Sequence, residues 1–176
     1  ESGDATRKFV LKLKDGETIE TVVIPAKNRL TQCISSQVGC AIGCTFCHTG
    51  TQGLTRHLTA GEVTGQFLKI TLWLKENVHP EERLTNIVYM GQGEPLHNYE
   101  NVKKATTNFL DDFGFGLGQR RITLSTSGLV PKIKMLHDFP PINIAISLHS
   151  AKNDTRTQLM PINKAYDLER LFEAIR

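Results

Sequence analysis

Apolar side chains occupy every second position near the start of the chain, at Phe9, Leu11 and Leu13. Asp15-Gly16 then provides a tight turn, and residues 18–24 are rich in β-branched side chains. Alternation on both sides of such a turn predicts a β-hairpin. We therefore expect a hairpin over residues 9–29, preceded by a polar tail over residues 1–8.

From residue 30 onward, short apolar runs alternate with stretches that have a helical apolar period. Thr59 and Glu62 stand at the two positions of a capping box, and an apolar stripe follows them. The expected strands are Leu30–Ser36, Ile87–Met90, Arg121–Ser125 and Ile142–Leu148, and the expected later helices are Asn101–Asp112, Pro131–Leu136 and Leu168–Ile175. Strands that alternate with helices imply parallel pairing with right-handed crossovers. Four such units are too few for an eight-unit barrel, so an α/β fold with a partial parallel barrel is expected over residues 30–176.

Composition narrows the class of protein without naming it. The 176 residues are 39% hydrophobic, which suits one globular core, and the net charge of +3 permits a nucleic-acid partner without requiring one. No run of about 18 apolar residues occurs, and the amino end is polar. We expect neither a membrane span nor a secretion signal.

The four cysteines all lie between positions 33 and 47, which indicates a ligand cluster rather than a disulfide framework. Cys40, Cys44 and Cys47 place three thiolates within eight residues of a glycine-broken loop, and soft ligands of this kind suit an iron-sulfur cluster or zinc. A zinc site would need a fourth ligand, for which Cys33, His48 and His57 are candidates. A cubane held by three cysteines would leave one iron open to a small molecule.

Six ordered motifs resemble the RlmN branch of the radical S-adenosylmethionine enzymes: Cys33–Cys47 with Phe46 before the last cysteine, Thr51–Leu54, Met90–Leu96, Thr123–Gly128, Ile146–His149 and Met160–Lys164. The resemblance extends from about Glu20 to Arg176. It implies a (β/α)6-type barrel, a 4Fe-4S cluster bound by Cys40, Cys44 and Cys47, and S-adenosylmethionine as cosubstrate. It further implies methylation of carbon 2 of an adenine in 23S rRNA and in tRNA by way of a 5′-deoxyadenosyl radical.

The resemblance also assigns roles to single residues. Gly93 and Glu94 would contact the methionine amino group, whereas Ser125 and the run Ser147, Leu148 and His149 would contact the ribose and carboxylate of the cosubstrate. Glu20 would accept a proton, and Cys33 would resolve a covalent enzyme–RNA adduct by forming a disulfide with a second cysteine that carries the methyl group. Taken alone, the same residues would be interpreted as ordinary turn, strand-end, solvent-facing and buried positions.

Two departures from the family pattern leave alternatives open. The chain has no cysteine after Cys47, so the methyl-carrying cysteine of the family is absent, and the accessory domain that normally precedes the hairpin does not fit in residues 1–8. The chain is therefore expected to be a core fragment, with methylation of adenine carbon 8, as in the sister Cfr enzymes, or a non-catalytic metal- or RNA-binding remnant as alternatives. Pro95 and Ser127 favour the carbon 2 branch.

The remaining expectations concern partners and packing. Phosphate contacts, if they are made by this chain, would come from basic side chains at Arg56, His57, Arg120, Arg121, Lys132, Lys134 and Lys164. Trp73 has helical spacing with Ile70 and Leu74, which favours packing over base stacking. Reduced thiolates point to the cytoplasm, and the family implies an electron donor such as flavodoxin. A monomer is expected.

Overall fold

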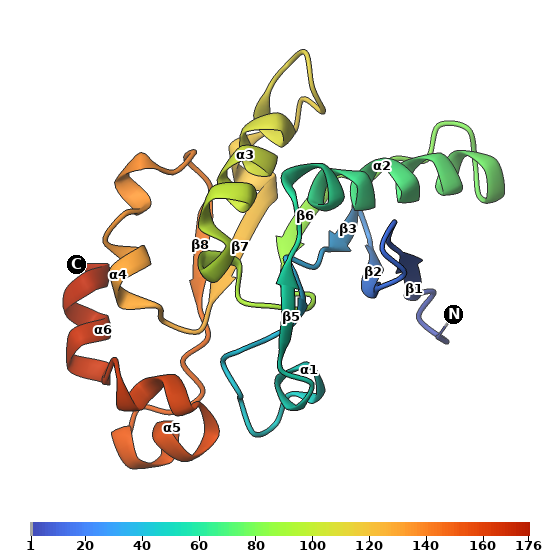
Figure 1. The fold of residues 1–176 in the computed structure, drawn as a ribbon. Helices are drawn as coiled ribbons and strands as arrows, with labels where there is room; N and C mark the ends of the chain where they lie inside the picture. Colours follow the sequence, from blue (N-terminus) through green and yellow to red (C-terminus); the bar gives the residue numbers. More distant parts are fainter. Residues whose placement is uncertain (1) are drawn as a thin grey trace.

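The computed structural model describes residues 2–176, which form one six-stranded sheet and a small two-stranded sheet (Figure 1). The order of strands in the large sheet is β1-β2-β3-β6-β7-β8. Its strands are β1 (Arg7–Lys12), β2 (Thr18–Ala26), β3 (Arg29–Cys33), β6 (Asn86–Tyr89), β7 (Ile122–Thr126) and β8 (Asn143–Ile146). β3, β6, β7 and β8 are parallel, as the alternation of strands and helices predicts. The parallel strands and their connecting helices confirm the predicted α/β class, and the strand order is linear in the described residues.

The predicted hairpin is present and extends the same sheet. β1 pairs antiparallel with β2, and β2 pairs antiparallel with β3, so the hairpin lengthens the sheet beyond the parallel strands. β1 begins at Arg7, two residues before the expected start of the hairpin. Phe9 packs edge-on against Trp73 with ring centroids 4.9 Å apart, which confirms that this tryptophan is a packing residue.

The parallel strands are connected by α2 (Ala60–Asn77), α3 (Tyr99–Leu110) and α4 (Val130–Ile133), and α5 (Asn153–Leu159) and α6 (Leu168–Ile175) follow β8. α2 begins with the predicted capping box, in which the hydroxyl of Thr59 accepts from the backbone N–H of Glu62 and the carboxylate of Glu62 accepts from the backbone N–H of Thr59. α2 packs on α3, and α4 packs on α6. Short 3₁₀ helices lie at η1 (Pro95–Asn98), η2 (Gln119–Arg121), η3 (Leu136–Asp138) and η4 (Pro161–Lys164).

The two faces of the parallel strands differ in burial. Ile87, Tyr89, Ile122 and Leu124 are buried with the apolar side chains of α2 and α3 and form the core. The alternate positions face the other way and are only partly covered, as the intermediate burial of Val88, Thr123 and Ser125 shows. Because side chains alternate along a strand, Thr123 and Ser125 of β7 lie on this open face, whereas Thr126 shares the buried face with Ile122 and Leu124.

The long loop expected around the cysteines is more ordered than its sequence indicates. β4 (Gln37–Gly39) pairs antiparallel with β5 (Leu54–His57), and α1 (His48–Thr51) lies between them. In Figure 1 this unit lies along the same edge of the molecule as α5. No helix in the described part of the chain is long and apolar enough to cross a membrane.

Candidate active site

The cysteine loop is closed at its base by a backbone contact that requires glycine. The N–H of Cys40 donates to the carbonyl of Gly53 at 2.7 Å. Gly39 has a φ of +75°, and a Cβ built there would lie 1.9 Å from the carbonyl oxygen of Gly53. Only glycine allows the two ends of the loop to approach so closely. The β4–β5 pair therefore fixes the position of the cysteine-bearing segment.

Cys40, Cys44 and Cys47 are free and half-buried, and all three line one open cavity of about 310 Å³. Burial, together with the neighbouring charges of Cys40 and Cys47, raises the pKa of Cys44 to about 11. Burial likewise raises the pKa of Cys40. A cationic centre bound among the three sulfurs would stabilise them as thiolates. The donor set therefore fits an iron-sulfur cluster.

Among the described residues, no three His, Cys, Asp or Glu side chains come close enough together to hold a single metal ion.

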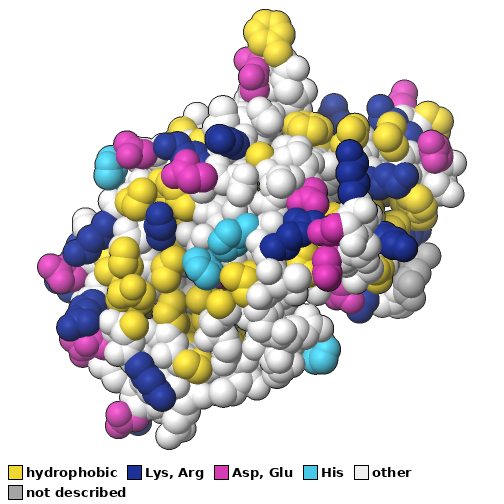
Figure 2. All heavy atoms as spheres, viewed as in Figure 1, with side chains coloured by type: hydrophobic (Ala, Val, Ile, Leu, Met, Phe, Trp, Pro, Cys, Tyr) yellow, Lys and Arg dark blue, Asp and Glu magenta, His cyan; other side chains and the backbone are white. Residues whose placement is uncertain are grey.

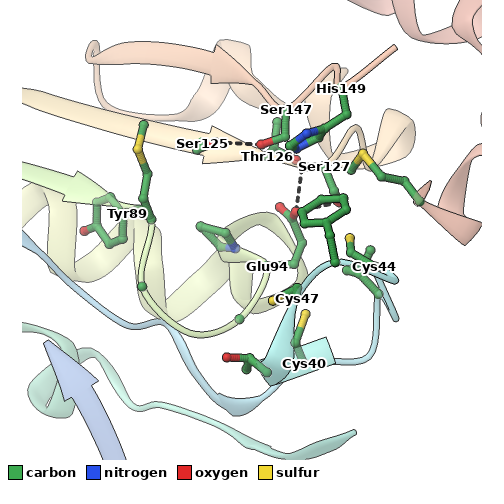
Figure 3. A pocket seen from close by; sticks show the side chains of 18 residues that line it. Cys40, Cys44, Cys47, Tyr89, Glu94, Ser125, Thr126, Ser127, Ser147 and His149 are labelled. Atoms are coloured by element: carbon green, nitrogen blue, oxygen red, sulfur yellow. Dashed lines mark hydrogen bonds between the residues drawn. The ribbon is translucent and has the colours of Figure 1, made fainter. Parts of the chain in front are cut away.

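Glu94 lies in the turn that follows β6, beside the cysteine loop, and its backbone N–H contacts the thiol of Cys40 (Figure 3). The residue is 4% exposed, and its carboxylate accepts from the N–H of Leu96 and from both the N–H and the hydroxyl of Ser127. No described Lys, Arg or His forms an ion pair with it. A buried carboxylate without a cationic partner can bind a cationic ligand group.

The rim opposite the cysteines is built from the ends of β7 and β8. The hydroxyls of Ser125 and Ser147 lie 3.1 Å apart, and both residues line the cavity (Figure 3). His149 has a φ of +59°, and its ring lies 4.4 Å from the ring of Phe46, which the cysteine loop contributes. The Phe46–His149 contact therefore joins the loop to the rim. Gly93 also lines the cavity, but Leu148 does not.

Leu148 contributes through its backbone to a buried arginine. Arg156 of α5 has no exposed surface, and its guanidinium donates to the carbonyls of Leu148 and Ser127 and to Oδ1 of Asn163. Burial lowers its pKa, whereas the neighbouring Cys44 raises it. The guanidinium of Arg156 therefore connects the segment that follows β7 with the segment that follows β8, close to Cys44 of the cysteine loop.

The structure does not bring Glu20 or Cys33 into the cavity lining. It does place both on the open face of the sheet, because Cys33 pairs in register with Val22 on one side and with Val88 on the other, and Glu20 is two residues from Val22. Glu20 forms an ion pair of 3.0 Å with Lys8. Burial raises the pKa of Cys33 to about 11. Its thiol contacts the backbone N–H of Met90, a residue of the lining.

The basic side chains proposed for phosphate binding divide into two groups. Arg56 differs from the expectation because its guanidinium is bound to Asp15 and Glu62 at 2.6 and 2.8 Å, so two carboxylates offset its charge. Lys132 lies over the ring of Tyr99. Arg120, Arg121, Lys134 and Lys164 are exposed. On the face in Figure 2, Lys and Arg side chains are interspersed with Asp and Glu side chains.

Sequence reasoning missed several residues that hold the site together. Arg156 and Gln37 gave no signal as site residues, because neither motif position nor composition distinguishes a buried polar residue from an exposed one. Ser127 was recognised only as a marker of the family branch. Phe46 was part of the cysteine signature, yet its contact with His149 depends on the tertiary fold.

The fold and this cavity place the chain among enzymes that hold a cluster at the carboxyl ends of parallel strands, and comparison with known proteins identifies the class. Residues 34–176 match the model of the radical SAM superfamily. The chain belongs to this superfamily, and membership implies a 4Fe-4S cluster and S-adenosylmethionine as cofactors.

Individual relatives are similar over nearly the whole chain. It is 50% identical to a "probable dual-specificity RNA methyltransferase RlmN" of Desulfitobacterium hafniense, covering 99% of this chain and 50% of the relative. It is also 50% identical to the dual-specificity RNA methyltransferase RlmN of Desulfosudis oleivorans, covering 100% of this chain and 47% of that relative. A crystal structure of a radical SAM methyltransferase from Sphaerobacter thermophilus has a TM-score of 0.93 at 43% identity, covering 100% of this chain and 51% of that one. The chain thus spans about half the length of these relatives.

Proposed function

We propose that this chain is the cofactor-binding core of an RNA methyltransferase that acts on carbon 2 of adenine in 23S rRNA and tRNA. One observation carries the proposal: three half-buried thiols and a buried, cation-free carboxylate line the same cavity at the carboxyl ends of parallel strands. The 50% identity to dual-specificity RNA methyltransferases supports the choice of substrate.

Cys40, Cys44 and Cys47 would hold the cluster as thiolates. When bound, the reduced cluster supplies the electron that cleaves the sulfonium of S-adenosylmethionine. The chain itself would orient the cosubstrate: the carboxylate of Glu94 would accept from the amino group, and the hydroxyls of Ser125 and Ser147 would hydrogen-bond its other polar atoms. Phe46 and His149, which are in contact, would form the wall on that side of the cosubstrate.

Glu20 and Cys33 would act on the RNA rather than on the cosubstrate. Both lie on the open face of the sheet, which supports a position facing a base that enters over this face. Release of Glu20 from Lys8 would let its carboxylate accept a proton. The thiol of Cys33 is protonated at neutral pH because burial raises its pKa, so it requires a base before it can attack a covalent adduct.

The partners follow from this chemistry. We propose RNA as the macromolecular substrate, with the exposed cations Arg120, Arg121, Lys134 and Lys164 as candidate phosphate contacts. The flavodoxin-type donor, the cytoplasmic location and the monomeric state remain predictions.

The test is mass spectrometry of nucleosides from the RNA of a strain that lacks its own carbon 2 methyltransferase and carries the gene for this protein. We expect 2-methyladenosine in 23S rRNA and in tRNA, and its loss in Cys40→Ala. 8-Methyladenosine instead would establish the carbon 8 alternative. Unmodified adenine with a protein that is expressed and carries its cluster would contradict the proposal and favour a binding module.

A further inference from the structure

Gln37 lies between the turn that carries Glu94 and two histidines near the surface. Its side chain is fully buried. Its Oε1 accepts from the backbone N–H of Glu94 at 2.8 Å. Its Nε2 lies 2.9 Å from Nδ1 of His57 and 3.4 Å from Nδ1 of His97. One amide therefore contacts the backbone of a cavity residue and both imidazoles.

The backbone contact decides which way this amide faces. A backbone N–H can only donate, so the amide oxygen must face Glu94 and the NH₂ group must face the histidines. An amide nitrogen has two hydrogens and no acceptor capacity. Nδ1 of His57 and Nδ1 of His97 must therefore both accept, which requires both rings to be neutral with their proton on Nε2.

The surroundings of the two rings agree with this state. The ring centroids lie 5.1 Å apart at an interplanar angle of 83°, so each ring can direct Nδ1 at the same amide. His97 is exposed and His57 half-buried, and burial together with the charge of His97 lowers the pKa of His57. The charged groups nearby are engaged elsewhere, because Arg56 pairs with Glu62 and the carboxylate of Glu94 faces Ser127.

The turn itself is tightly packed against Gln37. Gly93 has a φ of +96°, and a Cβ built there would lie 2.6 Å from Cβ of Gln37. A change in the position of this glutamine is thus transmitted directly to the backbone at Gly93 and Glu94.

We propose that Gln37 is a positioning residue for Glu94 and that it holds the turn in place only while His57 and His97 are both neutral. Protonation of either ring turns an acceptor into a donor that faces the NH₂ group of the amide. The amide cannot rotate without removing the acceptor from the N–H of Glu94. The cavity wall therefore senses the protonation of a histidine pair at the surface. This inference rests on the proposed function only for the role of Glu94.

The test is NMR of the protein without its cluster, which separates the outcome from that of methyl transfer. Long-range proton–nitrogen correlations of the imidazoles report the tautomer of each ring. At pH 8 we expect the Nε2–H tautomer for both His57 and His97. On acidification, the backbone amide signal of Glu94 should shift with the same midpoint as these rings, whereas the amide of Gly16 in the β1–β2 turn should not.

Gln37→Glu keeps an acceptor for Glu94 but replaces the NH₂ group with an anionic acceptor. Because a nearby anion favours imidazolium, the pKa of both rings should rise by about one unit or more. The control is Gln119→Glu, which adds the same charge at an exposed position. Gln119 precedes β7 and so lies at the end of that strand that is far from the cavity. This variant should leave the pKa values of both rings unchanged. An Nδ1–H tautomer at either ring in the wild-type protein overturns the proposal even if the variant fails to fold. Two further results would overturn it: equal titration midpoints of the histidines in the two variants, or a backbone amide signal of Glu94 that does not shift on acidification.

Discussion

Ser127 donates both its backbone N–H and its hydroxyl to the same carboxylate oxygen of Glu94, each at 2.7 Å. The carbonyl of Ser127 in turn accepts from the guanidinium of Arg156 at 2.6 Å. The orientation of the cavity carboxylate is therefore set by a buried chain of hydrogen bonds that begins on α5. A fully hydrogen-bonded polar network of this kind is rigid, so it holds a ligand-binding group in one orientation.

Ser127→Ala should weaken this arrangement while leaving the backbone contact intact. A hydrogen bond to a charged group contributes about 1.5–3 kcal/mol, so the free energy of unfolding should fall by about this amount. Urea denaturation of the cluster-free protein measures the change. The control is Thr107→Ala on the exposed face of α3, where the hydroxyl bonds only to the carbonyl of Lys103. Equal losses in the two variants would show that the hydroxyl of Ser127 does not stabilise the buried carboxylate.

Gly93→Ala separates backbone strain from crowding, because the chain offers a matched glycine. Gly16 has nearly the same φ, +93° against +96°, but a Cβ there would meet nothing within 4 Å. Gly16→Ala should lower the free energy of unfolding by about 1–2 kcal/mol through strain alone. Gly93→Ala should lose about 1–3 kcal/mol more, because its Cβ overlaps Gln37. The same urea experiment compares the two, and a loss no larger than that of Gly16→Ala would contradict the close packing.

Arg156→Met should destabilise the protein strongly. It leaves the carbonyls of Ser127 and Leu148 and Oδ1 of Asn163 without a donor in a buried setting, at about 1–3 kcal/mol each. A total of about 3 kcal/mol or more should lower the Tm by roughly 6–12 °C. Arg170→Met, at a side chain that is 65% exposed, should change stability by less than about 0.5 kcal/mol. Differential scanning calorimetry of both variants checks this, and similar Tm values would show that Arg156 is dispensable.

Acidification should destabilise the protein in the range where His57 titrates. Its pKa in the folded protein lies below the ordinary value of 6.5, so the unfolded chain binds the proton first. The contribution of His57 is fully present above pH 6.5 and is lost as the pH falls through the lowered folded pKa. Glu62 and Asp15 have pKa values held below 4.5 and 3.8 by Arg56, so their contribution is lost at lower pH.

The measurement is the Tm of the cluster-free protein between pH 7.5 and pH 5. The Tm should fall across this range, and His57→Asn should flatten that part of the profile. A Tm that stays level or rises in the wild-type protein would show that burial of the neutral imidazole does not contribute to stability.

Local signals were sufficient to predict part of this structure. The capping box at Thr59 and Glu62 and the alternation on either side of Asp15-Gly16 act over a few residues, and both elements form as predicted. The cysteine spacing also acts locally, because three thiols on one short loop must line the same cavity. These predictions succeeded because each depends on neighbours along the chain.

Other features depend on contacts that sequence spacing does not report. Arginine is normally exposed, so nothing in the run Asn153–Leu159 marks Arg156 as the most deeply buried cation of the site. The pairing of β4 with β5 joins strands of three and four residues across the cysteine loop, and such short segments have no clear period. The engagement of Arg56 by Asp15 and Glu62 brings together three separate elements, so the sequence alone predicts Arg56 only as a candidate phosphate contact.

The most direct test of the account is anaerobic reconstitution of the protein with iron and sulfide, followed by iron analysis and electron paramagnetic resonance of the reduced sample. We expect about four irons per chain and a reduced-cluster signal that changes when S-adenosylmethionine is added, with both lost when Cys40, Cys44 and Cys47 are replaced by alanine. A colourless protein that binds one zinc ion tightly, or a cluster signal that persists without these three thiols, would contradict the assignment of the site.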